Sequence, residues 1–187
     1  MPPKFKFTKD EIIDACFYLT KTEGLKAVTA RGVAAQLNSS SKVIFSLFKD
    51  MDDVKRAVVE RVKAYYKTFV DEGLKDALPF KGVGNAYIRF AQEEPKLFQL
   101  LFMQESKEKE SFKGAIRIDE SYDRILKAVQ NSYGLDEASA KELYNCLWVA
   151  THGIAVLVAT KVCNFTDEDI QSVLSKIIKG VLHEIKK

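Results

Sequence analysis

The chain has 187 residues, of which 47% are hydrophobic and 29% are charged, with a formal net charge of +3. This composition excludes general intrinsic disorder and suits a soluble protein with one large core, or with a small head joined to a larger body. The three cysteines, Cys16, Cys146 and Cys163, are too widely spaced for a disulfide framework or a metal knuckle, so we expect each to be a small core residue.

Helices are expected to dominate, because glycine and proline are few and alternating strand patterns are rare. An uncharged stretch that includes residues 145–160 is shorter than the ~20 apolar residues that span a bilayer. It also contains Asn145, Thr151 and His152, which favours a buried helix. The N-terminal sequence lacks the apolar segment of a secretion signal, so we expect a cytoplasmic protein.

Charge is distributed unevenly along the chain. Residues 1–49 carry eight basic and four acidic side chains, which leaves a small negative balance on residues 50–187. A basic head on a nearly neutral body is typical of a module that binds a polyanion and is attached to a part with another task.

The first helix is predicted to begin after Thr8, which can cap it, with Glu11 placed three residues on as in a capping box. Apolar residues then recur at helical spacing until Gly24, so the helix should end near Glu23. Thr29 is the next N-cap candidate and opens a short helix with a single apolar stripe.

A tight turn is predicted at Asn38 and Ser39, because asparagine accepts left-handed backbone angles. Ser40 can then cap a third short helix, which we expect to span Ser40 to Leu47. A long helix should follow from Asp52 to Gly73. Further helices are expected at about 80–94, 95–106, 112–133, 136–163 and 167–186, with Pro95 and Thr166 at two of the starts.

Two short helices around a tight turn, flanked by longer ones, are the layout of a helix-turn-helix head. The second short helix can enter the major groove of DNA while the first lies across the phosphates. Opposite its apolar residues, the predicted reading helix presents Ser41, Lys42, Phe45 and Ser46.

The run from Thr8 to Val58 resembles the DNA-binding domain of the TetR family of bacterial repressors. That family reads roughly as I-L-x-A-A, a glycine, V-T-x-R-x-I-A, a turn, and a tyrosine-containing recognition helix followed by phenylalanine and S-K-E. The matching residues here are IIDAC (12–16), Gly24, VTARGVA (28–34), Ile44-Phe45, Phe48 and DMD (50–52). Residues 87–98 are similar to the middle of many TetR ligand domains, and Trp148, His152 and Gly153 are similar to the Trp-x3-His-Gly pattern of one C-terminal subgroup.

Four positions depart from the family pattern. Asn38 and Lys42 stand where glycine is usual, Phe45 where tyrosine is usual, and Met51 where lysine is usual. Phenylalanine and methionine cannot bind phosphate oxygens, so backbone anchoring must come from other residues, and Lys42, Lys49 and Lys55 are our candidates. An alternative is that the head has lost DNA binding and survives only as packing.

The resemblance implies that the Thr29 hydroxyl and the Arg31 side chain contact phosphate, although Thr29 is a cap in any reading and Arg31 could be an ordinary solvated charge. The complete set of expected DNA-binding residues is Thr29, Arg31, Ser39, Ser40, Ser41, Lys42, Phe45, Ser46, Lys49 and Lys55.

The resemblance also implies a ligand cavity between helices of the body. His152 is either a polar ligand contact or a satisfied core histidine, and the aromatic residues are either cavity lining or plain core. The candidate ligand-binding residues are Phe90, Phe98, Phe102, Met103, Tyr122, Trp148 and His152.

No nucleophile elbow, phosphate loop, HExxH motif or histidine-based triad is present, so we expect no catalytic residues, no metal site and no cofactor.

The sequence predicts an all-α protein of about nine helices, with a three-helix helix-turn-helix head at 1–51 and a larger ligand-sensing and dimerisation bundle at 52–187. We expect a homodimer joined through 136–163 and 167–186. It would bind a near-palindromic operator and be released by a small-molecule effector. The resemblance implies a repressor, with activation as the alternative. A helical ligand-binding or protein-binding dimer without DNA binding is the alternative.

Overall fold

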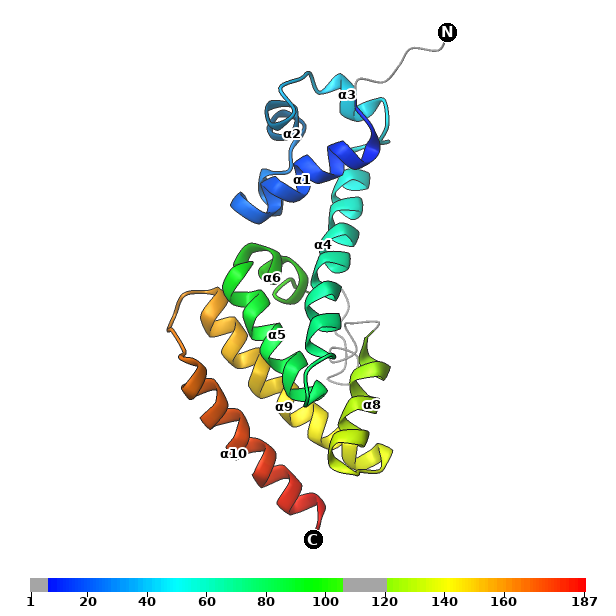
Figure 1. Cartoon of the computed structure of the whole chain (residues 1–187). Coiled ribbons are helices and arrows are strands. Elements are labelled where there is room, and N and C mark those ends of the chain that lie inside the picture. Colours follow the sequence, from blue (N-terminus) through cyan, green and yellow to red (C-terminus); the bar gives the residue numbers. More distant parts are fainter. Residues whose placement is uncertain (1–6, 106–120) are drawn as a thin grey trace. The chain divides into compact units, whose positions relative to one another are not determined.

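A computed structural model describes residues 7–105 and 121–187, and all regular secondary structure within these two ranges is helical (Figure 1). The expected all-α class is therefore confirmed. The helix expected at 112–133 falls partly outside these ranges, and its described part forms a helix from Tyr122 to Tyr133.

The chain forms two compact units, which divide it at Tyr65 and again around the segment Glu94–Gln104. Unit 1 holds α1 (Lys9–Glu23), the 3-10 turn η1 (Leu25–Ala27), α2 (Ala30–Gln36), α3 (Lys42–Phe45), the first part of α4 (Met51–Gly73) and α6 (Pro95–Phe102). Unit 2 holds the rest of α4 with α5 (Pro79–Glu93), α8 (Tyr122–Tyr133), α9 (Glu137–Ala159) and α10 (Asp167–Ile185). A functional boundary at residue 51 remains a prediction, since compactness alone assigns no function.

The predicted helix starts at Thr8 and Thr166 are confirmed. Thr8 accepts a hydrogen bond from the Glu11 backbone N–H, and the Glu11 carboxylate accepts one from the Thr8 N–H, which completes a capping box. Thr166 and Asp169 form the same reciprocal pair at the start of α10. These bonds satisfy backbone donors that the first helical turn leaves without partners.

Unit 1 is organised around apolar side chains that all its helices contribute. Its fully buried residues include Ile12 and Cys16 of α1, Val33 of α2, Ile44 of α3 and Val58 of α4. Burial raises the pKa of the Cys16 thiol to about 12, so this cysteine is an uncharged core residue as predicted.

A buried carboxylate ties α6 to the other helices of unit 1. Glu94, just before α6, is 4% exposed, and its Oε1 lies 2.5 Å from Lys21 Nζ of α1. The Tyr65 hydroxyl of α4 donates to the same oxygen at 3.1 Å. Because a buried charge is costly without such partners, this junction favours one arrangement of α1, α4 and α6.

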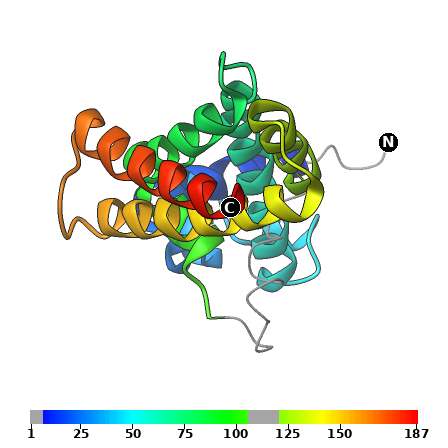
Figure 2. The same cartoon turned by 90° about the horizontal axis from the view of Figure 1, so that it is seen from below.

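Unit 2 is a bundle in which α9 packs against α5, α8 and α10. Figures 1 and 2 both show α10 lying beside α9 after a connecting loop. The backbones of α4 and α5 meet at two glycines: a Cβ placed on Gly73 would lie only 2.7 Å from the carbonyl oxygen of Gly82. Residues without a side chain are therefore required at this crossing.

Two predictions about cysteines are wrong. Cys146 and Cys163 are exposed, whereas we expected core positions. Cys146 lies on a side of α9 that its neighbours in unit 2 leave uncovered. Cys163 lies beyond α9, which ends at Ala159 and not at 163 as expected. Two residues after this end, Lys161 takes a left-handed φ of 57°, which is incompatible with a continuing helix. Helix α6 also ends earlier than expected, at Phe102 rather than 106.

Helix α9 is, in the described residues, the one helix long and apolar enough to cross a membrane by length and composition alone. Core helices of soluble proteins pass the same test. Eight of its residues, among them Leu143, Leu147 and Ile154, are buried within unit 2. The predicted assignment as a core helix fits this packing.

Candidate functional site

The turn between α2 and α3 has the geometry of a helix-turn-helix. Thr29 caps α2 by accepting the Gly32 N–H at 3.0 Å, as predicted. Asn38 takes a left-handed φ of 47°, which confirms its predicted role in the turn. The Ser39 N–H then donates to the Ala34 carbonyl at 2.9 Å, which fixes the exit of the chain from α2.

The regular part of α3 is shorter than predicted, at Lys42–Phe45 instead of Ser40 to Leu47. Helical turns extend it on both sides, since Val43 N–H donates to Ser40 O and Phe48 N–H donates to Ile44 O. Ser40 does not cap it. Ser41 occupies the N-cap position with helical angles, φ −61° and ψ −19°, and makes no side-chain cap, because a capping hydroxyl needs extended backbone.

One face of α3 is buried and the other is exposed. Ile44 is completely buried and Phe48 is 5% exposed, and these two side chains hold the helix on unit 1. Lys42 and Ser46 are exposed on the other side, and Phe45 is 48% exposed. The exposed face of α3 therefore carries an ammonium group, an aromatic ring and a hydroxyl.

The other expected DNA-binding residues fall into two groups. Thr29, Arg31, Ser40 and Lys49 are exposed on α2, the turn and the segment after α3, and Ser39 and Ser41 are half-buried in the turn. Lys55 differs, because it is half-buried and lines a pocket with lysines of η1 and α6.

In unit 2, His152 forms a polar centre among aromatic rings. The Trp148 ring stacks on the His152 ring, with centroids 4.9 Å apart and planes within 4°. His152 Nδ1 lies 2.9 Å from the Tyr87 hydroxyl of α5. Burial lowers the pKa of His152, which favours its neutral form, and burial raises that of Tyr87, which therefore stays a phenol able to donate to Nδ1.

The remaining ligand-binding candidates belong to both units. Phe90 is completely buried in unit 2 and packs against Tyr66 and Phe69, while Tyr122 packs edge-on against Tyr144 at 5.2 Å. Phe98 and Phe102 pack against each other on α6 of unit 1, where Met103 is 37% exposed. Sequence reasoning missed Tyr87 as a site residue. A tyrosine among buried α5 positions was a usable signal, but its partner lies 65 residues away.

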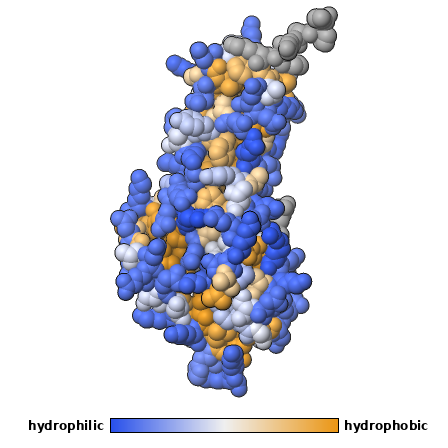
Figure 3. Space-filling model, viewed as in Figure 1, coloured by the Kyte–Doolittle hydropathy of each residue, from blue (hydrophilic) through white to orange (hydrophobic). Residues whose placement is uncertain are grey.

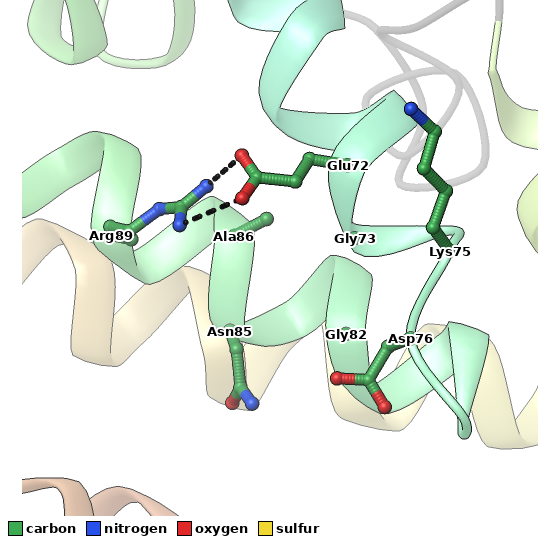
Figure 4. A pocket seen from close by; sticks show the side chains of 8 residues that line it. All are labelled: Glu72, Gly73, Lys75, Asp76, Gly82, Asn85, Ala86 and Arg89. Carbon is green, nitrogen blue, oxygen red and sulfur yellow. Dashed lines mark hydrogen bonds and ion pairs between the residues drawn. The ribbon is translucent and has the colours of Figure 1, made fainter.

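A pocket of about 350 Å³ opens between the end of α4 and α5 in unit 2. Figure 4 shows Arg89 and Glu72 pointing toward each other there. Their closest atoms are 2.6 Å apart, and this contact lowers the pKa of Glu72. The two basic lining residues, Lys75 and Arg89, are matched by two acidic ones, Glu72 and Asp76, so the lining has no net formal charge to attract an ion. None of the predicted ligand-binding residues lines it.

Comparison with known families accounts for most of unit 2. The family description "Tetracyclin repressor-like, C-terminal domain" matches residues 80–181. The chain belongs to the TetR family. The resemblance first noted in the head is thus confirmed by an independent match in the body, whereas assignment to the Trp-x3-His-Gly subgroup remains a prediction.

Solved TetR-type structures share the fold. SmeT, the repressor of the Stenotrophomonas maltophilia multidrug efflux pump SmeDEF, is 17% identical with a TM-score of 0.55, and the match covers 96% of this chain and 91% of SmeT. A Mesorhizobium loti protein assigned to the TetR family of transcriptional regulators is 16% identical with a TM-score of 0.54, covering 94% of this chain and 95% of that one. A search among curated protein sequences found no match. At these identities the likeness establishes the fold alone.

Proposed function

We propose that this TetR-family chain is a ligand-responsive transcriptional repressor that binds a near-palindromic operator as a homodimer and leaves it when a small molecule binds. The observation that carries the proposal is the two-sided character of α3. Ile44 and Phe48 are buried and support it, while Lys42, Phe45 and Ser46 are exposed opposite them.

The DNA surface in this proposal extends from the α2 start across the turn to the end of α3. Thr29 and Arg31 would meet phosphate on one side, and Lys42 and Lys49 on the other. The short side chains of Ser41 and Ser46 require the α3 backbone to approach the bases closely. The Ser46 hydroxyl donates to Val43 O at 2.6 Å, which leaves its oxygen as an acceptor for a base amino group.

Dimer formation would use α9 and α10, as the sequence predicts. Val149 and Leu157 of α9 are 49% and 37% exposed, and Gly153 lies between them at the spacing of one helical face. Nothing lies within 4 Å of a Cβ placed on Gly153, so a second copy can approach closely there. On α10, Val173 is 39% exposed. Figure 3 shows apolar side chains interrupting the hydrophilic surface of unit 2 on the face it presents.

Effector sensing would centre on His152 with Trp148 and Tyr87. This group offers a hydrogen-bonding ring beside a flat aromatic surface, which fits an aromatic molecule with a polar substituent. Two heads must sit about one helical turn of DNA apart, roughly 34–36 Å, to use both half-sites. An effector that prefers a dimer with another separation lowers operator affinity by its differential binding to the two states.

The experiment is selection of bound duplexes from a random or genomic pool with the purified protein, followed by a screen for compounds that release them. On the selected duplex, Lys42→Ala should weaken binding at all sequences and reduce the slope of log affinity against log salt by about one. Lys127→Ala, at an exposed position of α8, is the matched control and should change neither.

Failure to enrich any duplex at low salt would favour the alternative, a helical dimer that binds a ligand or protein without DNA. The exposed Phe45 ring and methionine at position 51 are the observations that motivate this alternative. If duplexes are enriched but Lys42→Ala binds them as tightly as the wild type, Lys42 is not a phosphate anchor.

A further inference from the structure

A second pocket, of about 360 Å³, lies entirely within unit 1. Three lysines line it, and each comes from a different element: Lys26 from η1, Lys55 from α4 and Lys96 from α6. The end of α1 closes the pocket with Glu23 and Gly24. A site assembled from four elements has a defined shape only when unit 1 is folded.

The lysines of this pocket outnumber its acidic lining residues. Glu23 is its one acidic lining residue. Within residues 7–105 and 121–187, none of Lys26, Lys55 and Lys96 forms an ion pair with a carboxylate. The pocket of unit 2 differs in this respect, because Glu72 there binds Arg89. Three cations around a concavity with a single lining carboxylate attract an anion.

One wall of the lysine pocket is apolar. The stem of Lys96 passes over Gly24, with its Cδ 3.8 Å from the place of a Cβ there. Leu100 of α6 is mostly buried and Leu25 of η1 is half-buried, and both line the pocket. A ligand in this place would meet carbon on one side and ammonium groups on the other.

We propose that the lysine pocket binds a small organic molecule with at least two negative charges, of the class of phosphorylated metabolites. Lysine ammonium groups bind phosphate as point charges, and the volume falls in the range of small-molecule sites. Lys96 belongs to α6, outside the helix-turn-helix, so a free phosphate suits the three-sided arrangement better than a duplex backbone does. The site is separate from the aromatic group around His152 and does not depend on an effector binding there.

The test uses the full-length protein and inorganic pyrophosphate as the probe, with binding followed by titration calorimetry. The pocket variant is Lys26→Gln with Lys96→Gln. The control is Lys81→Gln with Lys127→Gln, which removes two exposed lysines of α5 and α8 and has the same net charge. Wild type and control should bind one pyrophosphate, and the pocket variant should bind at least about tenfold more weakly. Lys55→Gln alone should weaken binding in the same direction.

Absence of saturable binding to the wild type, or an equal loss in pocket and control variants, overturns the proposal. The same variants, checked for unchanged melting temperature, are then measured on duplex DNA across a salt series. If the pocket variant loses duplex affinity as Lys42→Ala does while retaining pyrophosphate binding, the lysines serve DNA phosphates and the proposal is wrong. If no duplex is bound by the wild type but pyrophosphate binding depends on the pocket, the site stands and the repressor proposal fails.

Discussion

The surface of α3 and the aromatic group of unit 2 hold their proposed site residues in opposite ways. On α3, the proposed site residues Lys42, Phe45 and Ser46 are exposed. Different residues, Ile44 and Phe48, are buried and hold the helix in place. In unit 2, His152 is itself packed against Trp148 and bonded to Tyr87, so its site residues are also structural. Substitutions should therefore separate binding from stability in the head and should couple the two in the body.

Phe90→Ala should have the largest effect, and it tests whether the candidate site residues of unit 2 are also structural. Phe90 is completely buried and contacts Tyr66 and Phe69, so its removal leaves a cavity and should lower the free energy of unfolding by about 3–5 kcal/mol. Denaturant unfolding measures this. A loss below about 1 kcal/mol would show that the ring lines an open ligand cavity instead of filling the core.

A pair of threonine caps sharpens the comparison. Thr29→Ala and Thr166→Ala each remove a hydroxyl that accepts a backbone N–H at the start of a helix. Each should cost about 1 kcal/mol of stability. Only Thr29→Ala should also weaken duplex binding beyond that shared loss, because Thr29 belongs to the proposed phosphate surface. Equal duplex affinity of the two variants would mean that Thr29 is only a cap.

Acidification should give the smallest effect, confined to unit 2. Burial holds the pKa of His152 below its ordinary value of 6.5, so the unfolded chain takes up a proton at this residue before the folded chain does. Its contribution to stability is therefore complete above about pH 6.5 and is lost as pH falls below it. Melting temperatures measured on either side should show this loss in the wild type and less of it in His152→Gln. Identical pH profiles would contradict the assigned cause.

The sequence could predict features whose partners are a few residues apart. The caps at Thr8, Thr29 and Thr166 and the left-handed Asn38 depend on bonds within one turn, and each was visible in residue order. The wrong predictions concern features set by residues far apart in the sequence, or positions where two neighbouring residues offer the same chemical group. Ser40 and Ser41 offered the same hydroxyl, and only the backbone angles of the folded turn decide that neither caps α3.

Features of the body site were harder to predict, because they depend on which faces of helices meet. Tyr87 and His152 are joined across α5 and α9, and nothing in either local pattern specifies that pair. The exposure of Cys146 depends on which side of α9 its neighbours leave uncovered. The sequence predicts Lys55 as a phosphate contact, which stays a prediction, but it could not predict that Lys55 shares a pocket with Lys26 and Lys96.

The contact of α4 with α5 has a practical consequence for anyone attaching a reporter group to this protein. At Gly73 and Gly82 even a methyl group would meet backbone, so a cysteine introduced for a dye at either residue should disrupt unit 2. Residues 75–78, only a few positions away, are all exposed. A fluorophore placed on that loop, just beyond the end of α4, should leave the fold intact.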